Sequence, residues 1–380
     1  MRHRIDQRVW ICCWLLFLPR GMPAGEIESA LEAIKAVGRE GAGNEQASRH
    51  WREIVNAGPK ALLPIFQAFQ GADSTTANWL RLAVEAILER ETQAGRPVEK
   101  SLFESVATDR SRPAAARDLA FEVLDQLDPT ARERLLPGML NDPSARIRRE
   151  AIDWALRAMP SADRLAELFT MARDIDQVER IAKELKGLGR EPDVIQHLGL
   201  ITRWQIAGPF DNSGLKGFSQ PLPAEVTWRD YATGHDRAVV NLYRAFNLKR
   251  GVDPETKTKA AIYALVRTEV ESPTEQPVQI RAATPNAIRI WLNGQEVFAR
   301  EEYHHGMKMD QHVGRGVLRA GRNEILAKIC QDDRTYEWTL DWQFQMRLCD
   351  EIGGAIRVRV LTAPEAEPDK PEATKKEPMR

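Results

Sequence analysis

The chain has 380 residues, enough for about two or three domains of ordinary size. Hydrophobic residues make up 43% and charged residues 29%, which excludes a disordered, collagen-like or polytopic membrane protein. The 54 Lys and Arg residues are balanced by 55 Asp and Glu residues, so the bulk charge indicates no nucleic acid or anionic membrane as a partner. Four cysteines are too few for a disulfide scaffold.

The N-terminus, residues 1–24, has the organisation of a secretory signal peptide. Three of the first eight residues are Arg, and the apolar run VWICCWLLFL (residues 9–18) and a Gly/Pro/Ala-rich stretch follow. This run is too short to span a bilayer, which takes about 20 residues. We therefore predict cleavage near Ala24, export to the periplasm or the extracellular space, and a mature chain without a membrane span. The alternative is the start of a buried apolar helix.

Removal of the signal peptide would leave two cysteines, Cys330 and Cys349. They lie on segments that we expect to form the two arms of a hairpin, with its turn near residues 334–336. In that register the residue opposite Cys330 is near Trp342, not Cys349. Two buried free thiols are therefore expected, and a disulfide would require a different register.

Residues 25–200 carry the pattern of a helical repeat protein. Leu, Ala and Ile recur at spacings of three and four residues, and Pro and Gly fall between the helical stretches. Four similar segments share an alanine at spacings of 37, 31 and 31 residues: Ala83, Ala120, Ala151 and Ala182. Such spacing is typical of helical hairpins stacked into a solenoid, where a small side chain lets paired helices approach closely. The alternative is a helical bundle with coincidental spacing.

The third of these segments, NDPSARIRREA (residues 141–151), carries the most specific motif. Asp142 is expected to cap a helix with Pro143 in its first position, where the missing N–H of proline costs nothing. The motif resembles the HEAT-repeat signature, in which Asp-Pro begins the second helix and an Arg follows. This resemblance implies a HEAT-like solenoid with a concave protein-binding face. Ala131, near an expected loop, is expected to tolerate a larger side chain.

Near Trp204 the apolar periodicity changes from 3.6 residues to two. Short alternating segments bounded by Gly, Pro, Asn and Asp then continue through residues 201–362. This pattern predicts an antiparallel β-sandwich. The tail, residues 363–380, is rich in proline and charge and is predicted to be disordered.

The β-rich part also contains a clear hairpin pattern. Ile290 and Leu292 alternate with Trp291, so that the tryptophan is expected to face away from the core. Asn293-Gly294 then predicts a type I′ turn into the next strand.

Three motifs of the β-rich part resemble those of galactose-binding-like jelly-roll modules, in the order found in that family. They are WQIAGPF (residues 204–210), IRIWLNG (288–294) and LRAGRNEILAK (318–328). The resemblance implies a multidomain α plus β protein, in which a HEAT-like α-helical solenoid precedes a jelly-roll β-sandwich. It also implies carbohydrate or protein binding without catalysis, with ligand residues on variable loops. The combination of the two parts resembles exported bacterial proteins.

Aromatic and polar residues of the expected loops are the candidate ligand-binding residues. Sugar rings stack on Trp and Tyr, while amides and carboxylates bind their hydroxyl groups. The candidates are Trp291, Asn293, Tyr303, His305, Asp310, Tyr336 and Trp338. Packing inside the protein is the alternative role for each aromatic residue.

Two groups of residues leave metal binding open. The stretch YHHGMKMDQH (residues 303–312) holds three histidines and one acid at close range, as metal sites do, although histidines of an exposed loop are usually just solvated. A second group surrounds an expected turn and could bind calcium or simply be solvated: Asp332, Asp333, Glu337 and Asp341. No cofactor is predicted.

The motifs of common enzyme classes are missing from the sequence. There is no Gly-x-Ser-x-Gly elbow, and the glycines at 38, 41 and 43 lack the Lys-Ser/Thr of a phosphate-binding loop. We therefore predict a non-catalytic exported binding or scaffold protein, whose sandwich recognises carbohydrate or protein and whose helical repeats contact proteins. The alternative is an enzyme, or a hydrolase accessory subunit, with a site between the domains. No nucleic acid partner is expected.

Overall fold

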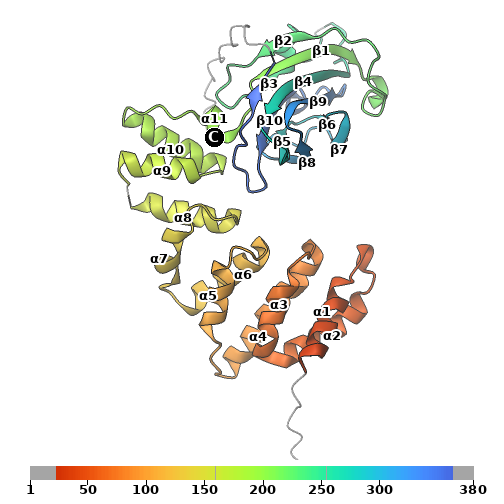
Figure 1. Cartoon of the computed structure of the whole chain (residues 1–380). Coiled ribbons are helices and arrows are strands. Elements are labelled where there is room, and N and C mark those ends of the chain that lie inside the picture. Colours follow the sequence, from red (N-terminus) through yellow and green to blue (C-terminus); the bar gives the residue numbers. More distant parts are fainter. Residues whose placement is uncertain (1–22, 159, 254, 363–380) are drawn as a thin grey trace, which may run out of the picture. The chain divides into compact units, whose positions relative to one another are not determined.

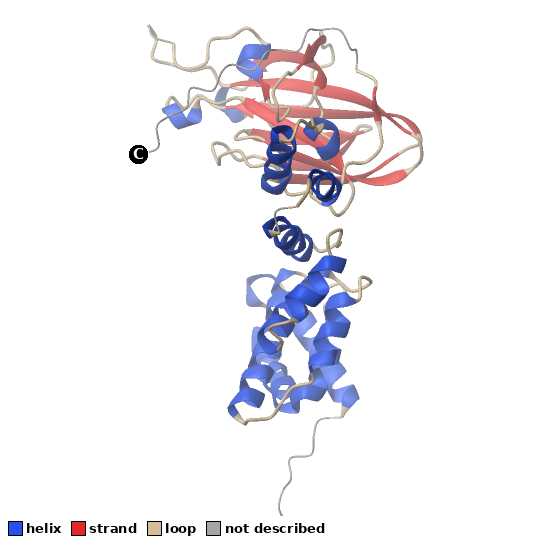
Figure 2. Cartoon of the chain, turned by 90° about the vertical axis from the view of Figure 1, so that its left-hand side faces the viewer, coloured by secondary structure: helices blue, strands red, loops and turns tan. Residues whose placement is uncertain are grey.

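The computed structural model describes residues 23–158, 160–253 and 255–362 (Figure 1). The predicted tail and all but the last two residues of the predicted signal peptide lie outside the described residues. Helices occupy the N-terminal half and antiparallel strands the C-terminal half (Figure 2), which confirms the predicted fold class. None of the described helices is long and apolar enough to cross a membrane.

The helices of the N-terminal half follow one another through short connections. They are α1 (Ala24–Lys35), α2 (Asn44–Ala57), α3 (Leu62–Ala68), α4 (Ser74–Gln93), α5 (Lys100–Thr108), α6 (Ala114–Leu127), α7 (Ala131–Leu135), α8 (Ala145–Arg157), α9 (Ala162–Met171), α10 (Ile175–Gly187) and α11 (Val194–Leu198). The four alanines of the sequence repeat lie on α4, α6, α8 and α10, and each is at most 5% exposed. A side chain without bulk therefore sits where these helices pack.

Asp142 does not cap a helix, contrary to the expectation from Asp-Pro. α8 begins at Ala145, and Ser144 takes the capping role, since its Oγ accepts the N–H of Ile147 at 3.3 Å. Asp142 instead binds the guanidinium of Arg117 in α6 through both oxygens, at 2.7 and 2.6 Å. Both side chains are almost completely buried, and Arg117 also donates to the carbonyl of Ala107. Loss of Asp142 would leave the buried charge of Arg117 without its carboxylate, and breaking a buried pair in this way typically costs about 3–5 kcal/mol.

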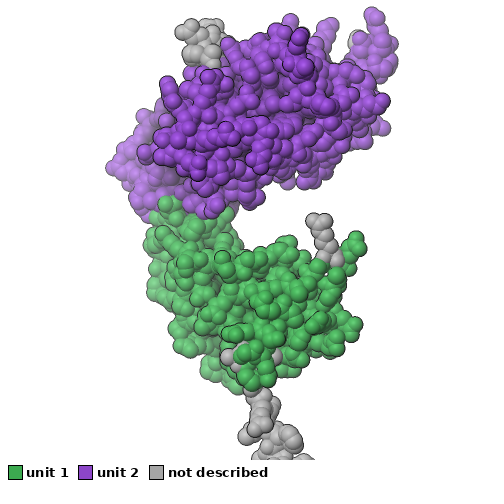
Figure 3. All heavy atoms as spheres, turned by 45° about the vertical axis from the view of Figure 1, so that its right-hand side comes forward, with its two compact units in different colours: residues 1–147 green, residues 148–380 purple. Residues whose placement is uncertain are grey.

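The described chain forms two compact units, one ending at Ile147 and one beginning at Arg148 (Figure 3). This division does not coincide with the change from helix to strand, which falls between Leu198 and Arg203. Helices α9 to α11 thus belong to the same compact unit as the strands. Within that unit, Leu200 forms a β-bridge with Arg347, so the end of the helical segment continues directly into the sheet region.

The strands of the second unit form two antiparallel sheets (Figure 1). One has the order β2-β1-β4-β9-β6-β7, with β11 beside β4, and the other has the order β3-β10-β5-β8. Their bounds are β1 (Arg203–Asp211), β2 (Arg229–Ala232), β3 (Val240–Asn241), β4 (Ile262–Ser272), β5 (Gln276–Ala283), β6 (Ala287–Leu292), β7 (Gln295–Arg300), β8 (His312–Leu318), β9 (Gly321–Gln331), β10 (Gln343–Cys349) and β11 (Arg359–Val360). A short helix, α12 (Leu242–Ala245), follows β3.

The sheets share one apolar core. Alternate residues of each strand point inward, because successive side chains of a strand face opposite sides. Val266 and Ile329 come from one sheet and Ile280 and Met346 from the other, and all four are buried in this core. Trp204 at the start of β1 is fully buried there as well.

The predicted hairpin at Asn293-Gly294 is confirmed. β6 pairs with β7, and both turn residues have positive φ, 51° at Asn293 and 80° at Gly294, as a type I′ turn requires.

The predicted hairpin around residues 334–336 is wrong. β9 pairs with β4 and β6, whereas β10 pairs with β3 and β5, so the two strands lie in opposite sheets. The connection from residue 332 to residue 342 crosses from one sheet to the other, and a pattern of alternation cannot reveal which sheet a strand joins. Cys330 and Cys349 are accordingly both free and buried.

Candidate functional site

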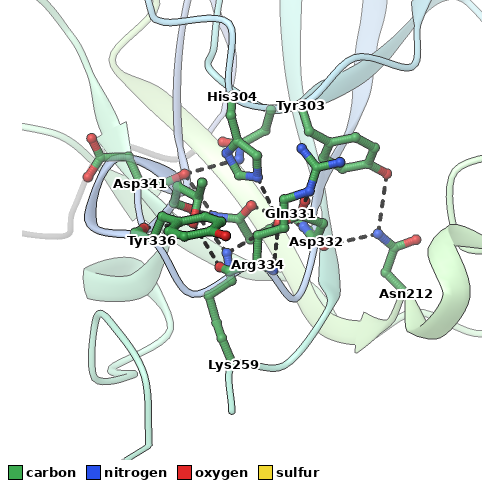
Figure 4. A network of polar contacts seen from close by, with 11 residues as sticks. Asn212, Lys259, Tyr303, His304, Gln331, Asp332, Arg334, Tyr336 and Asp341 are labelled. Atoms are coloured by element: carbon green, nitrogen blue, oxygen red, sulfur yellow. Dashed lines mark hydrogen bonds and ion pairs between the residues drawn. The ribbon is translucent and has the colours of Figure 1, made fainter. Parts of the chain in front are cut away.

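Two loops meet at one place on the sandwich (Figure 4). One, residues 301–311, connects β7 to β8, and the other, residues 332–342, connects β9 to β10. The histidine Nε2 of His304 lies 2.7 Å from Oδ1 of Asp332 and joins the two loops. Lys259, which precedes β4, reaches the same carboxylate.

Asp332 is the centre of this polar network. Its carboxylate is buried, and Oδ1 accepts hydrogen bonds from His304, from Lys259 Nζ at 3.3 Å and from the backbone N–H of Arg334 at 3.2 Å. Burial lowers the pKa of His304 and of Lys259, because water no longer stabilises their charged forms. The carboxylate therefore ties together three segments that are distant in the sequence.

The loop from β9 to β10 is also held at its far end. Gln331 donates from Nε2 to the carbonyls of Thr339 at 3.0 Å and Asp341 at 2.9 Å. Lys259 Nζ donates to the same Thr339 carbonyl at 3.0 Å. The Thr339 hydroxyl donates back to the carbonyls of Arg334 and Tyr336, at 2.8 and 2.7 Å. These hydrogen bonds hold the loop in one conformation before any ligand arrives.

Tyr336 and Trp338 stand out from this rigid loop. Each is 65% exposed, more than any other large apolar side chain among the described residues. Their rings are nearly parallel, 7° apart in orientation, with 5.9 Å between centroids. The ring of His304 lies edge-on to Trp338, with 5.7 Å between centroids. We call Tyr336 and Trp338 the aromatic platform.

A cluster of exposed charges is formed by two carboxylates of the same loop and by Arg250 from the segment between α12 and β4. Arg250 donates from Nη1 to Glu337 at 3.1 Å and from Nε to Asp341 at 3.0 Å. Glu337 stands between the two platform residues in the sequence. We call Arg250, Glu337 and Asp341 the rim cluster.

Three of the predicted site residues, Tyr303, His305 and Asp310, have structural partners within the protein. Tyr303 accepts a hydrogen bond from Asn212 Nδ2 at 3.4 Å, and burial raises its pKa to about 12. His305 is hydrogen-bonded to the side chain of Gln311. Asp310 accepts from Arg281 at 2.8 Å and from Nε of the buried Arg347 at 2.6 Å.

Trp291 and Asn293 have roles in the β6–β7 hairpin. Trp291 is half-buried and faces away from the core as predicted, with the guanidinium of Arg289 at 5.1 Å from its ring centroid. Asn293 donates from its side chain to Asn323 and accepts the N–H of Glu324, both at 2.9 Å, which fixes the turn. Of the seven predicted residues, only Tyr336 and Trp338 present their side chains openly to solvent.

The two groups considered as metal sites do not converge. Among the described residues, no three His, Cys, Asp or Glu side chains are placed so that they could hold a metal ion. In the first group, His304 and Asp310 bind different partners. In the second, Asp332 binds His304 and Lys259, whereas Glu337 and Asp341 bind Arg250.

The residues that support the platform were not among the predicted site residues. Lys259 and Gln331 carry no motif, and Asn212 belongs to the stretch around WQIAGPF that resembles the jelly-roll modules, without a predicted role. Lys259 follows a polar stretch that is typical of solvated loops, yet it is 5% exposed. Gln331, at the end of β9, is completely buried as well, and no local pattern distinguishes it from an exposed glutamine.

Comparisons with known proteins give no family. No family model and no curated protein matches the sequence. Among solved structures, a β-glucosidase from Kluyveromyces marxianus in complex with glucose is 10% identical at a TM-score of 0.26, over 41% of this chain and 16% of the enzyme. An anti-sigma factor domain-containing protein from Clostridium clariflavum is 9% identical at a TM-score of 0.26, over 46% of this chain and 48% of that one. The chain thus matches less than half of either structure, and at these TM-scores the likenesses carry no functional conclusion.

Proposed function

We propose that the protein is an exported, non-catalytic binding protein whose β-sandwich recognises carbohydrate through the aromatic platform. The observation that carries this proposal is the pair of parallel, exposed rings of Tyr336 and Trp338 on a loop held by buried hydrogen bonds. The apolar face of a sugar ring stacks on such a surface. Full burial of an exposed aromatic side chain contributes about 1.5–3 kcal/mol.

The rigidity of the loop supports the same role. A platform that is already ordered pays little conformational entropy on binding. Asp332 and Gln331 hold the loop from beneath, so the rings need not be assembled by the ligand.

The remaining parts of the proposal rest on sequence resemblance. The sandwich is proposed to be galactose-binding-like, supported by its two antiparallel sheets and the hairpin at Asn293-Gly294. The helices are proposed to be HEAT-like repeats that contact proteins, supported by the buried alanines of the repeat and the Arg117–Asp142 pair between α6 and the start of α8. Export is proposed from residues 1–24, and N-terminal sequencing of the native protein would contradict it by finding a start at Met1.

The carbohydrate proposal is tested by screening the full mature chain on an array of neutral and acidic oligosaccharides. The affinity for the best ligand is then measured by calorimetry. Tyr336→Ala and Trp338→Ala should each weaken binding about tenfold or more, because each removes a stacking surface. Val317→Ala is the matched control, since Val317 is also exposed, at 52%, but lies on β8.

Two results would count against the proposal. Failure of the wild-type chain to bind any saccharide of the array would overturn the proposal. Equal affinity of the wild-type and Trp338→Ala proteins would show that the platform is not the binding surface. The bound saccharide should also be recovered intact after long incubation, since the proposal is binding without turnover.

A further inference from the structure

The rim cluster lies directly beside the residues of the aromatic platform. We propose that it makes the platform selective for uncharged saccharides and against uronates and other anionic sugars. This inference rests on the proposed function, because it assigns the ligand class of the same site.

The rim cluster is open to a ligand. The side chains of Glu337, Asp341 and Arg250 are 82%, 48% and 44% exposed, so each keeps a substantial part of its surface in solvent. Glu337 is adjacent in sequence to both platform rings, and Arg250 reaches it from the segment between α12 and β4. A sugar stacked on the platform would therefore have its hydroxyl groups near this cluster.

The chemistry of the cluster suits neutral hydroxyl groups. A guanidinium only donates hydrogen bonds and a carboxylate only accepts them, whereas each sugar hydroxyl does both. Neighbouring hydroxyls of one ring can thus bind Arg250 and a carboxylate together, with charge-assisted hydrogen bonds. A ligand carboxylate could use only Arg250 and would face the oxygens of Glu337 and Asp341.

The charge balance points the same way. Two carboxylates and one guanidinium give the rim cluster a formal charge of −1. The other charged residues of the two adjoining segments do not reverse this sign, because their four positive charges are matched by four negative ones: Lys249, Lys257, Lys259 and Arg334 against Asp253, Glu255, Asp332 and Asp333. An anionic sugar should therefore bind about tenfold more weakly than its neutral counterpart at low salt.

The experiment compares sugars that differ only at C6. Cellotriose, mannotriose, galactotriose and the best neutral ligand of the array are each measured against the uronate with the same linkage. Calorimetry of the full mature chain is done at low and at physiological salt. The neutral sugar should bind about tenfold more tightly, and the difference should shrink as salt screens the carboxylates.

Two variants move the charge of the cluster in opposite directions. The double variant E337Q/D341N changes it to +1 and should raise uronate affinity about tenfold. It should weaken neutral binding, because amide oxygens accept weaker hydrogen bonds from the hydroxyl groups than carboxylates do. Arg250→Gln changes it to −2 and should widen the difference between neutral and anionic sugars. Glu296→Gln is the matched control, because Glu296 is an exposed carboxylate that pairs with Arg289 on the β6–β7 hairpin.

The outcomes separate the two proposals. The proposed selectivity is wrong if the wild-type protein binds neutral sugars and uronates equally. It is also wrong if E337Q/D341N gains no uronate affinity while its melting temperature is unchanged. In both cases the proposal that the platform binds carbohydrate is unaffected. If no saccharide of either kind binds, the proposed function and the selectivity fall together.

Discussion

His312 is a candidate metal ligand in the sequence but a buried side chain in the structure. In the sequence it belongs to a histidine-rich stretch that left metal binding open. In the structure it is 2% exposed, so its imidazole is almost completely removed from water. Its ring packs against Phe298 and His305, at centroid distances of 5.1 and 5.4 Å. Burial, followed by the proximity of His305, lowers the pKa of His312 to about 4.

This pKa predicts a loss of stability at acidic pH. The unfolded chain has a histidine pKa of about 6.5, so as the pH falls the unfolded state takes up the proton first. The contribution of His312 to the free energy of unfolding should therefore fall between about pH 6.5 and pH 4. At pH 5 the loss relative to pH 7 should be about 2 kcal/mol.

Urea unfolding of the wild-type protein and of His312→Phe at pH 7 and pH 5 measures this effect. Other groups titrate in both proteins, so the comparison isolates His312. The wild-type protein should lose about 2 kcal/mol more than the variant. An identical loss in both proteins would show that His312 is protonated as readily in the folded state as in the unfolded one.

At the scale of single helices, the repeat alanines are the clearest test of packing. Ala120 on α6 is completely buried, and α6 packs against α5. Ala115 lies on the same helix but is exposed. Ala120→Leu should destabilise the protein by about 1–3 kcal/mol through overpacking, whereas Ala115→Leu should change stability by about 0.5 kcal/mol or less.

Thermal unfolding of the two variants checks this prediction. Ala120→Leu should lower the melting temperature of the helical part by several degrees, and Ala115→Leu should leave it unchanged. Equal shifts would mean that α6 presents a different face to its neighbours. Ala131 cannot serve as a control, contrary to the expectation from sequence, because it is the first residue of α7 and is completely buried.

At the scale of the whole molecule, the apolar periodicity and the compact units give different folding boundaries. The change of periodicity predicts that residues 201–362 fold alone, whereas the compact unit that contains the sheets begins at Arg148. The buried Arg347 of β10 donates to the carbonyls of Leu198 at 3.3 Å and Gly353 at 3.0 Å. The N–H of Leu348 also donates to the carbonyl of Gly199 at 3.0 Å.

These contacts predict that a fragment of residues 148–362 melts at a higher temperature than a fragment of residues 201–362. Removal of residues 148–200 takes away the Leu198 carbonyl that accepts from the buried Arg347 and the Gly199 carbonyl that accepts from the N–H of Leu348. Buried donors that lose an acceptor cost stability. Circular dichroism of both fragments, followed through thermal unfolding, gives the comparison. Equal melting temperatures would favour the boundary at residue 200 that the periodicity predicts.

The sequence by itself determined the features that depend on neighbouring residues. Helical and alternating periodicities separated the two halves of the chain, because side-chain direction repeats every 3.6 residues in a helix and every two in a strand. Asn293-Gly294 predicted its turn, because positive φ at two successive positions demands such residues. Tyr336 and Trp338 could also be proposed for ligand binding from the sequence, because the polar residues around them predict a surface loop.

Only the tertiary structure decided what lies beside those residues. Alternation shows which face of a strand is apolar but not which strand it pairs with. The sequence therefore predicts β9 and β10 as a hairpin, although they lie in opposite sheets. Asp332 meets Lys259 across 73 residues of sequence, and Arg250 meets Asp341 across 91. Contacts between residues so far apart in the sequence form when two sheets pack on a common core and bring their connecting loops together. A local sequence pattern does not show which loops will meet.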